Sequence, residues 1–169
     1  MKTLKALSLI LTLTLSVLLA SAQKSASNID KITAAYFSVK DALAAGNGAA
    51  AQNDAKQLFA ALSVQPDKGL NAAQQKSLNT YLDKLKFDSR HISETSAIDH
   101  QREHFASLSK NVYEVLKSVK TNTKPIYMQY CPMKKAYWLS ESAQIKNPYY
   151  NDKMMTTCGS TKATLAAVK

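Results

Sequence analysis

The residues best suited to chemistry lie between positions 130 and 159, a stretch that holds both cysteines, three of the five methionines and the only tryptophan. Cys131 stands two residues before Met133, and Cys158 stands three residues after Met155, which follows Met154. Thiolate and thioether sulfur are the soft ligands that select Cu(I) and related ions. This spacing favours a soft-metal site built from these five residues, with Cu(I) as the expected ion.

The same two cysteines also allow one intramolecular disulfide. In an exported protein a disulfide is the usual state of such a pair. Closing a loop of about 28 residues would stabilise the fold by roughly 3–4 kcal/mol. However, packing alone poorly explains a polar loop that carries two cysteines and three methionines. Metal ligation and a Cys131–Cys158 disulfide therefore both remain open, and the two states could interconvert with redox conditions.

The histidines form a second set of candidate ligands. His100 and His104 are four residues apart in one predicted helix and share a face, while His91 lies near the end of the preceding helix. An antiparallel turn would bring all three to one end of the protein. We expect His100 to be an ordinary solvated residue and His91 and His104 to be the candidate ligands. Zn(II), which takes about four Cys, His or carboxylate ligands, is the second candidate metal. Its expected set is Cys131, Cys158, His91 and His104.

Trp138 is the only tryptophan in the chain. A single tryptophan is most simply a core anchor, and the alternative for Trp138 places its ring against a bound cation.

The sequence has no Gly-rich phosphate loop, no Gly-x-Ser-x-Gly and no Cys-x-x-Cys. Glu103 stands in the wrong place for a His-Glu-x-x-His helix. We therefore predict that the protein is not an enzyme.

Residues 1–22 have the pattern of an export signal. Lys2 and Lys5 precede an uncharged, largely apolar run over residues 6–19, and a small-x-small cleavage site ends at Ala22. The apolar run is too short for a membrane span. We expect cleavage after Ala22 and a periplasmic or secreted protein that does not span a membrane.

The remaining chain, residues 23–169, has the length of one domain. A formal net charge of +10 raises nucleic acid as a partner. Export and the scattered positions of the lysines argue against that partner, so we expect no nucleic-acid binding and lysines that mainly solvate helix faces.

Four segments between about residues 27 and 120 show apolar residues at alternating spacings of three and four, which is typical of helices. The first begins with the capping-box pair Ser27 and Asp30 and ends before Gly46; the others run from Ala49 to Leu62, from the cap Asn71, and from Ser96 to about Lys120. Short connections between helices of similar length favour antiparallel neighbours. The predicted fold class is mainly α, an up-and-down four-helix bundle.

The pattern changes after Pro125. Residues 126–130 and 137–139 are rich in aromatic and β-branched residues, which favours a small hairpin around residues 132–135. Residues 141–159 would then form a loop that returns Cys158 towards Cys131. We expect residues 125–160 to be a short β-like or irregular Cys/Met segment packed on the bundle.

Several runs resemble a bacterial domain family of unknown function, DUF3347. The Gln-Arg-x-x-Phe-x-x-Leu-Ser signature matches residues 101–109, and further similarity lies in Tyr130-Cys131-Pro132-Met133, Trp138-Leu139-Ser140, residues 145–150 and residues 155–159. The similarity covers nearly the whole chain after residue 22. The sequence departs from the family pattern at Asn151, where a Gly is common, and in the short 134–136 link, where relatives often carry a longer insert.

Members of that family occur as small exported proteins and joined to periplasmic adaptor subunits of heavy-metal efflux systems of the copper/silver type. The resemblance therefore implies a soft-metal role, in which Cys131, Met133, Met155 and Cys158 match the motif. It makes an efflux adaptor the expected protein partner. The expected function is a periplasmic soft-metal binding protein, a carrier or accessory of heavy-metal efflux; the alternative is a non-catalytic envelope interaction module stapled by a disulfide.

Overall fold

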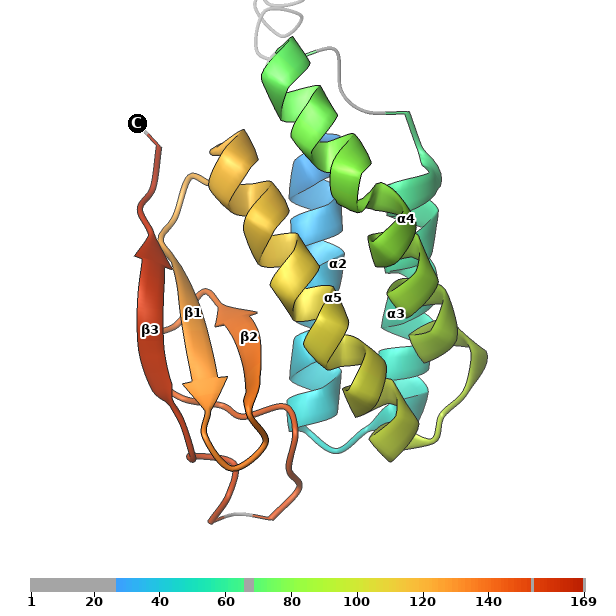
Figure 1. The fold of residues 1–169 in the computed structure, drawn as a ribbon. Helices are drawn as coiled ribbons and strands as arrows, with labels where there is room; N and C mark the ends of the chain where they lie inside the picture. The colour runs from blue at the N-terminus through green and yellow to red at the C-terminus, as the bar shows by residue number, and fades with distance from the viewer. Residues whose placement is uncertain (1–26, 66–68, 153, 169) are drawn as a thin grey trace, which may run out of the picture.

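The chain folds into helices followed by a small sheet (Figure 1). The computed structural model describes residues 27–65, 69–152 and 154–168, and these contain four helices and one three-stranded antiparallel sheet. The elements are α2 (Asn28–Ala44), α3 (Gly48–Ser63), α4 (Ala72–Glu94), α5 (Ile98–Val119), β1 (Ile126–Cys131), β2 (Ala136–Ser140) and β3 (Ser160–Leu165). The prediction of a mainly α fold with a β-like C-terminal part is confirmed. The predicted export signal lies outside the described residues.

Local capping explains where two of the helices begin. The Ser27 hydroxyl accepts a hydrogen bond from the Asp30 amide, and the Asp30 carboxylate accepts one from the Ser27 amide, each at 3.1 Å. Asn71 and Gln74 form the same reciprocal pair at the start of α4. Each pair satisfies amides that the first turn leaves without helical partners. The predicted caps at Ser27 and Asn71 are therefore confirmed.

The predicted cap of the fourth helix is wrong. Instead of starting at Ser96, α5 begins at Ile98 after Ala97, which makes no side-chain cap bond. The buried side chain of Gln101 instead holds the α4–α5 connection, donating hydrogen bonds to backbone carbonyls at Gly48 (2.9 Å) and Thr95 (2.6 Å). Gln101 is polar although it lies on the apolar face of α5. Its side chain is needed there because it donates hydrogen bonds to backbone carbonyls that are buried beneath that face.

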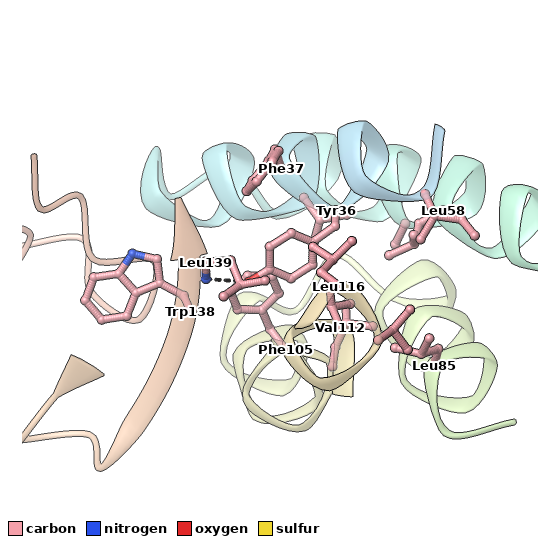
Figure 2. Close-up of a cluster of buried hydrophobic side chains, with 14 of the residues drawn as sticks. Tyr36, Phe37, Leu58, Leu85, Phe105, Val112, Leu116, Trp138 and Leu139 are labelled. Atoms are coloured by element: carbon pink, nitrogen blue, oxygen red, sulfur yellow. Dashed lines mark hydrogen bonds between the residues drawn. The ribbon is translucent and has the colours of Figure 1, made fainter. Parts of the chain in front are cut away.

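Tyr36 joins the helices to the sheet. Its ring stacks on Phe105 with centroids 5.3 Å apart, and its hydroxyl lies 2.8 Å from the Ser109 hydroxyl. The same oxygen accepts a hydrogen bond from the Leu139 amide of β2 at 2.9 Å (Figure 2). Burial raises the pKa of Tyr36, so the phenol stays neutral in this position. One side chain thus connects α2, α5 and β2.

The sheet forms the predicted hairpin and adds a strand that was not predicted. β1 pairs with β2 from Tyr127↔Ser140 to Cys131↔Ala136, and Lys135 takes a positive φ of 52° in the turn between them. β3 pairs with the other edge of β1, giving the order β2-β1-β3. The side chains of β3 are mostly exposed, so no apolar alternation marked it in the sequence.

Adjacent residues of β2 face different surroundings. Leu139 points towards the helices, whereas Trp138 points away from them, towards the C-terminal segments (Figure 2). Both side chains are buried. β2 is therefore covered on one face by α2 and α5 and on the other by the chain around Tyr149 and Gly159, which both lie against Trp138. In the described part of the chain, no helix has the length and apolar character needed to cross a membrane.

Candidate metal centres

The two cysteines come together as the sequence predicted. Cys131 ends β1, Cys158 lies just before β3, and their sulfur atoms are 3.6 Å apart. Both are free thiols, with Cys131 buried and Cys158 half-buried. A disulfide bond would require about 2.05 Å. The structure thus presents two neighbouring thiols from segments 27 residues apart.

Asn147 positions the loop that carries Cys158. This fully buried side chain donates a hydrogen bond to the Cys158 carbonyl at 2.7 Å and accepts one from the Tyr149 amide at 2.9 Å. The Asn147 amide also donates to the Thr156 carbonyl at 2.8 Å. The loop over 147–158 is therefore closed on itself next to the thiols, and sequence reasoning did not identify the residue that closes it.

Trp138 and Gly159 hold the other side of Cys158. Gly159 has φ 150°, and a Cβ added there would lie 2.7 Å from the Trp138 ring. Trp138 is fully buried and packs edge-on against Tyr149 with ring centroids 6.2 Å apart. The side chain is a core anchor, and in the described residues the cation–π contacts involve tyrosine rings instead.

The two thiols are electrostatically unequal. Burial disfavours the thiolate of Cys131, but hydrogen bonds outweigh burial and lower the pKa of Cys131 below its ordinary value. The groups that form them are the backbone of Lys134, the side chains of Asn147 and Cys158, and the backbone of Met133. The hydrogen bond with Cys131, followed by burial and the Cys131 charge, raises the pKa of Cys158. Cys131 is therefore the more acidic thiol of the pair.

The three candidate methionines flank the thiols from two segments. Met133 lies in the β1–β2 turn and Met154 and Met155 lie in the turn before Cys158. The side chains of Met133 and Met154 are 69% and 84% exposed, while Met155 is half-buried. Methionine is ordinarily used to fill gaps in cores. The exposure of Met133 and Met154 rules out that explanation for these two positions.

The histidines form a second cluster at the junction of α4 and α5. The candidate ligand atoms of His91, His100 and His104 all lie within 4.8 Å of one another. The rings of His91 and His104 are nearly parallel with centroids 4.5 Å apart, and the His100 and His104 centroids are 4.8 Å apart. The predicted meeting of the three histidines is confirmed. His100 is exposed, as expected for a solvated residue, but its ring belongs to the same cluster as those of the candidate ligands His91 and His104.

Two acidic residues of α4 lie beside histidine rings, and one of them is within hydrogen-bond distance. The Asp88 carboxylate, 3% exposed, lies 3.1 Å from His104 Nδ1. Glu94 lies 3.8 Å from His91 Nδ1. Sequence reasoning missed Asp88, although its place three residues before His91 puts the two on one side of α4.

The two clusters are separate. Of the described His, Cys, Asp and Glu residues, only the three histidines form a converging group of three or more, and neither cysteine belongs to it. The zinc set of two cysteines with His91 and His104 is therefore not assembled.

Arg102 shows how α5 separates them. It is two residues from both His100 and His104, which places it about 200° around the helix from each. Its guanidinium donates to the carbonyls of Pro148 (2.8 Å) and Leu43 (3.1 Å) and to the Asn151 side chain. The loop that carries Cys158 therefore packs on one face of α5 and the histidines lie on another. Asn151, one of the departures from the family pattern, provides one of these contacts.

Comparison with known proteins identifies a family but no function. The family described as Protein of unknown function (DUF3347) matches residues 32–124 of the 169-residue chain, and the chain therefore belongs to this family. The match includes all three histidines and ends before β1, so the Cys/Met motifs lie outside it. No curated protein matches the chain, and no solved structure does.

Proposed function

We propose that this DUF3347 protein binds one soft metal ion, Cu(I) or Ag(I), through Cys131 and Cys158. The observation that carries the proposal is the 3.6 Å separation of two free thiols supplied by distant segments. Soft thiolate ligands favour Cu(I), which two such donors can hold. The pair is preorganised, because the end of β1 and the backbone of the Asn147-closed loop place the two cysteines side by side before any ion arrives.

The surrounding residues suit an ion that enters and leaves. Cys131 is buried and Cys158 is half-buried, so access is from the side of Cys158. The thioethers of Met133 and Met155, on the segments that flank the thiols, would supply further soft donors, with Met154 as a third candidate. These side chains explain why the preference would be for Cu(I) over Zn(II), since thioether is a good cuprous ligand and a poor zinc ligand.

Copper affinity of the reduced protein, measured in competition with a Cu(I) chelator, tests this proposal. We expect one Cu(I) per chain, and a loss of affinity of at least about 100-fold on changing either cysteine to Ser, because one of two thiolate donors disappears. Met133→Leu and Met155→Leu should weaken Cu(I) binding about 10-fold and leave Zn(II) binding unchanged. Met128→Leu, on β1 and outside the thioether set, is the matched control and should have no effect. Full copper affinity in both cysteine variants would contradict the proposal.

The competing proposal is a non-catalytic interaction module stapled by a Cys131–Cys158 disulfide. The same short sulfur–sulfur distance favours it, since a small movement would bring the atoms to bonding distance. Alkylation of the protein directly in the cell envelope, followed by mass measurement, separates the two. Two alkylated thiols support metal ligation, whereas an unalkylated chain two hydrogens lighter than the reduced form supports the staple.

The cellular setting is part of the same proposal. Residues 1–22 would direct export and be removed after Ala22, leaving a single domain that works in the periplasm, with a heavy-metal efflux adaptor as the partner that receives the ion. The domain would be an up-and-down helical bundle, an arrangement supported by the packing of each helix on the next. The mass of the protein recovered from the periplasm tests the export step: a chain that begins at Met1 and remains in the cytoplasm would contradict it.

A further inference from the structure

We infer that His91, His100 and His104 form a second metal site, separate from the thiols, which binds a borderline divalent ion such as Zn(II) through three imidazole nitrogens. The chain has three histidines, and all three lie in this cluster, at the junction of α4 and α5. Imidazole is the ligand type that suits Zn(II), Cu(II) and Ni(II) rather than Cu(I). The site therefore differs from the thiol pair in donor atoms as well as in position.

The geometry is close to that of a bound ion. The ligand atoms lie within 4.8 Å of one another. Three nitrogens bound tetrahedrally to Zn(II) at about 2.0–2.1 Å would be about 3.3–3.4 Å apart. Rotation of the half-buried and exposed imidazoles would shorten the distances between the nitrogens to those of a bound ion without moving α4 or α5. A fourth position would remain for water because His100 is exposed.

Asp88 selects the nitrogen of His104 that can bind a metal. Its carboxylate lies 3.1 Å from Nδ1 of His104. Because an ionised carboxylate can only accept a hydrogen bond, this contact favours the tautomer with the proton on Nδ1 and leaves the Nε2 lone pair for the metal. The exposed Glu94 carboxylate lies near Nδ1 of His91 at 3.8 Å, which is beyond hydrogen-bond distance, so Asp88 is the supporting carboxylate of the cluster. A carboxylate behind the distal nitrogen is the usual support of a metal-ligating histidine. The nearly complete burial of Asp88 is the independent observation that favours a metal site over a simple stack of aromatic rings.

Phe87 completes the surroundings. Its ring lies 4.4 Å from the His91 ring and 5.7 Å from the His104 ring, although the side chain is 51% exposed. An apolar side chain beside a metal site limits the access of water to the ligands. One side of the cluster is thus covered by an aromatic ring, and the side of His100 is open to solvent.

The experiment uses the Cys131→Ser/Cys158→Ser double variant, in which the thiol pair cannot bind metal. Calorimetric titration with Zn(II) should show one ion per chain. His91→Ala, His100→Ala and His104→Ala should each lower the Zn(II) affinity at least 10-fold. Asp88→Asn should lower it 10- to 100-fold, the range typical for a lost outer-shell carboxylate. Glu103→Gln, an exposed carboxylate on the same helix, is the matched control and should change the affinity less than 3-fold.

Electron paramagnetic resonance of the Cu(II)-loaded double variant counts the ligands independently. Hyperfine structure from three nitrogens is expected, with one nitrogen fewer in His100→Ala, whose exposed position leaves folding intact. Absence of Zn(II) binding to the double variant, or unchanged affinity in His100→Ala, would overturn the inference. Because the thiols are absent from every sample, neither result affects the Cu(I) proposal.

Discussion

The helices and the C-terminal segment each assemble a cluster of metal-binding side chains, but by different means. In the helical region the histidines are 4 and 9 residues from their neighbours in the cluster, and two adjacent helices place them. In the C-terminal segment the thiols are 27 residues apart and come from a strand end and a loop. In the helices, short sequence separations bring the histidines together. In the C-terminal segment, the position of Cys158 instead depends on single buried side chains such as Asn147.

The two clusters also differ in their exposure to solvent. The nitrogen donors lie on the surface, supported by Asp88 and open to solvent at His100. The two thiols lie partly inside the protein, with Cys131 buried and Cys158 half-buried. Imidazoles resist oxidation and tolerate an exposed position, whereas burial shields the Cys131 thiol from oxidants in solvent. The two regions should therefore respond differently to substitution.

The largest effect is expected from Trp138→Ala. Removing this fully buried ring should lower the free energy of unfolding by about 3–5 kcal/mol, because a large cavity forms between the sheet and the loop. Native-state hydrogen exchange should lose protection mainly over β1–β3, and Cu(I) affinity should fall with it. Leu58→Ala, a cavity in the fully buried face of α3 that should cost about 2–5 kcal/mol, is the control. Equal loss of protection in both variants throughout the chain would show that the two regions unfold as one unit.

Gly159→Ala should have a smaller effect on the same region. The added Cβ would lie 2.7 Å from the Trp138 ring at a φ of 150°, so we expect a loss of about 1–3 kcal/mol and weaker Cu(I) binding. Zn(II) binding at the histidines should not change. Gly69→Ala is the matched control, since a Cβ there meets nothing within 4 Å, and its stability should change by less than about 0.5 kcal/mol. Chemical denaturation of both variants measures the contrast, and equal stabilities would refute it.

Tyr36→Phe tests the connection between the two regions. Loss of the hydroxyl removes its hydrogen bonds with Ser109 and the Leu139 amide, which should cost about 1–2 kcal/mol. Both metal affinities should be unchanged, because the fold on each side of the connection remains. Tyr81→Phe, at a half-buried position on α4, should cost less than about 0.5 kcal/mol. Thermal unfolding of the two variants at equal concentration provides the comparison, and a Tyr36→Phe protein as stable as wild type would show that the connection contributes nothing.

Sequence reasoning succeeded where the signals were local. The caps at Ser27 and Asn71, the apolar helix faces and the hairpin turn all depend on residues a few positions apart, so the pattern determines them. The meeting of the two cysteines was also predicted, from the loop direction alone. The features that sequence reasoning missed depend on contacts between distant segments of the chain.

Three examples show why those contacts were missed. β3 presents mostly exposed side chains and is specified by its pairing with β1. Gln101 holds the start of α5 through carbonyls of the helices before it, which no capping pattern encodes. Asp88 is an unremarkable acidic residue of α4 until α5 brings His104 against it. Each of these roles exists only in the folded chain.

The central claim, that the thiol pair is the Cu(I) site, is tested most directly by X-ray absorption at the copper edge of the reduced protein loaded with one equivalent of Cu(I). We predict a first coordination shell of sulfur only, identical in wild type and in a variant whose three histidines are changed to Ala. A shell that contains nitrogen in wild type and changes when the histidines are removed would contradict the claim and assign the copper to the α4–α5 cluster instead.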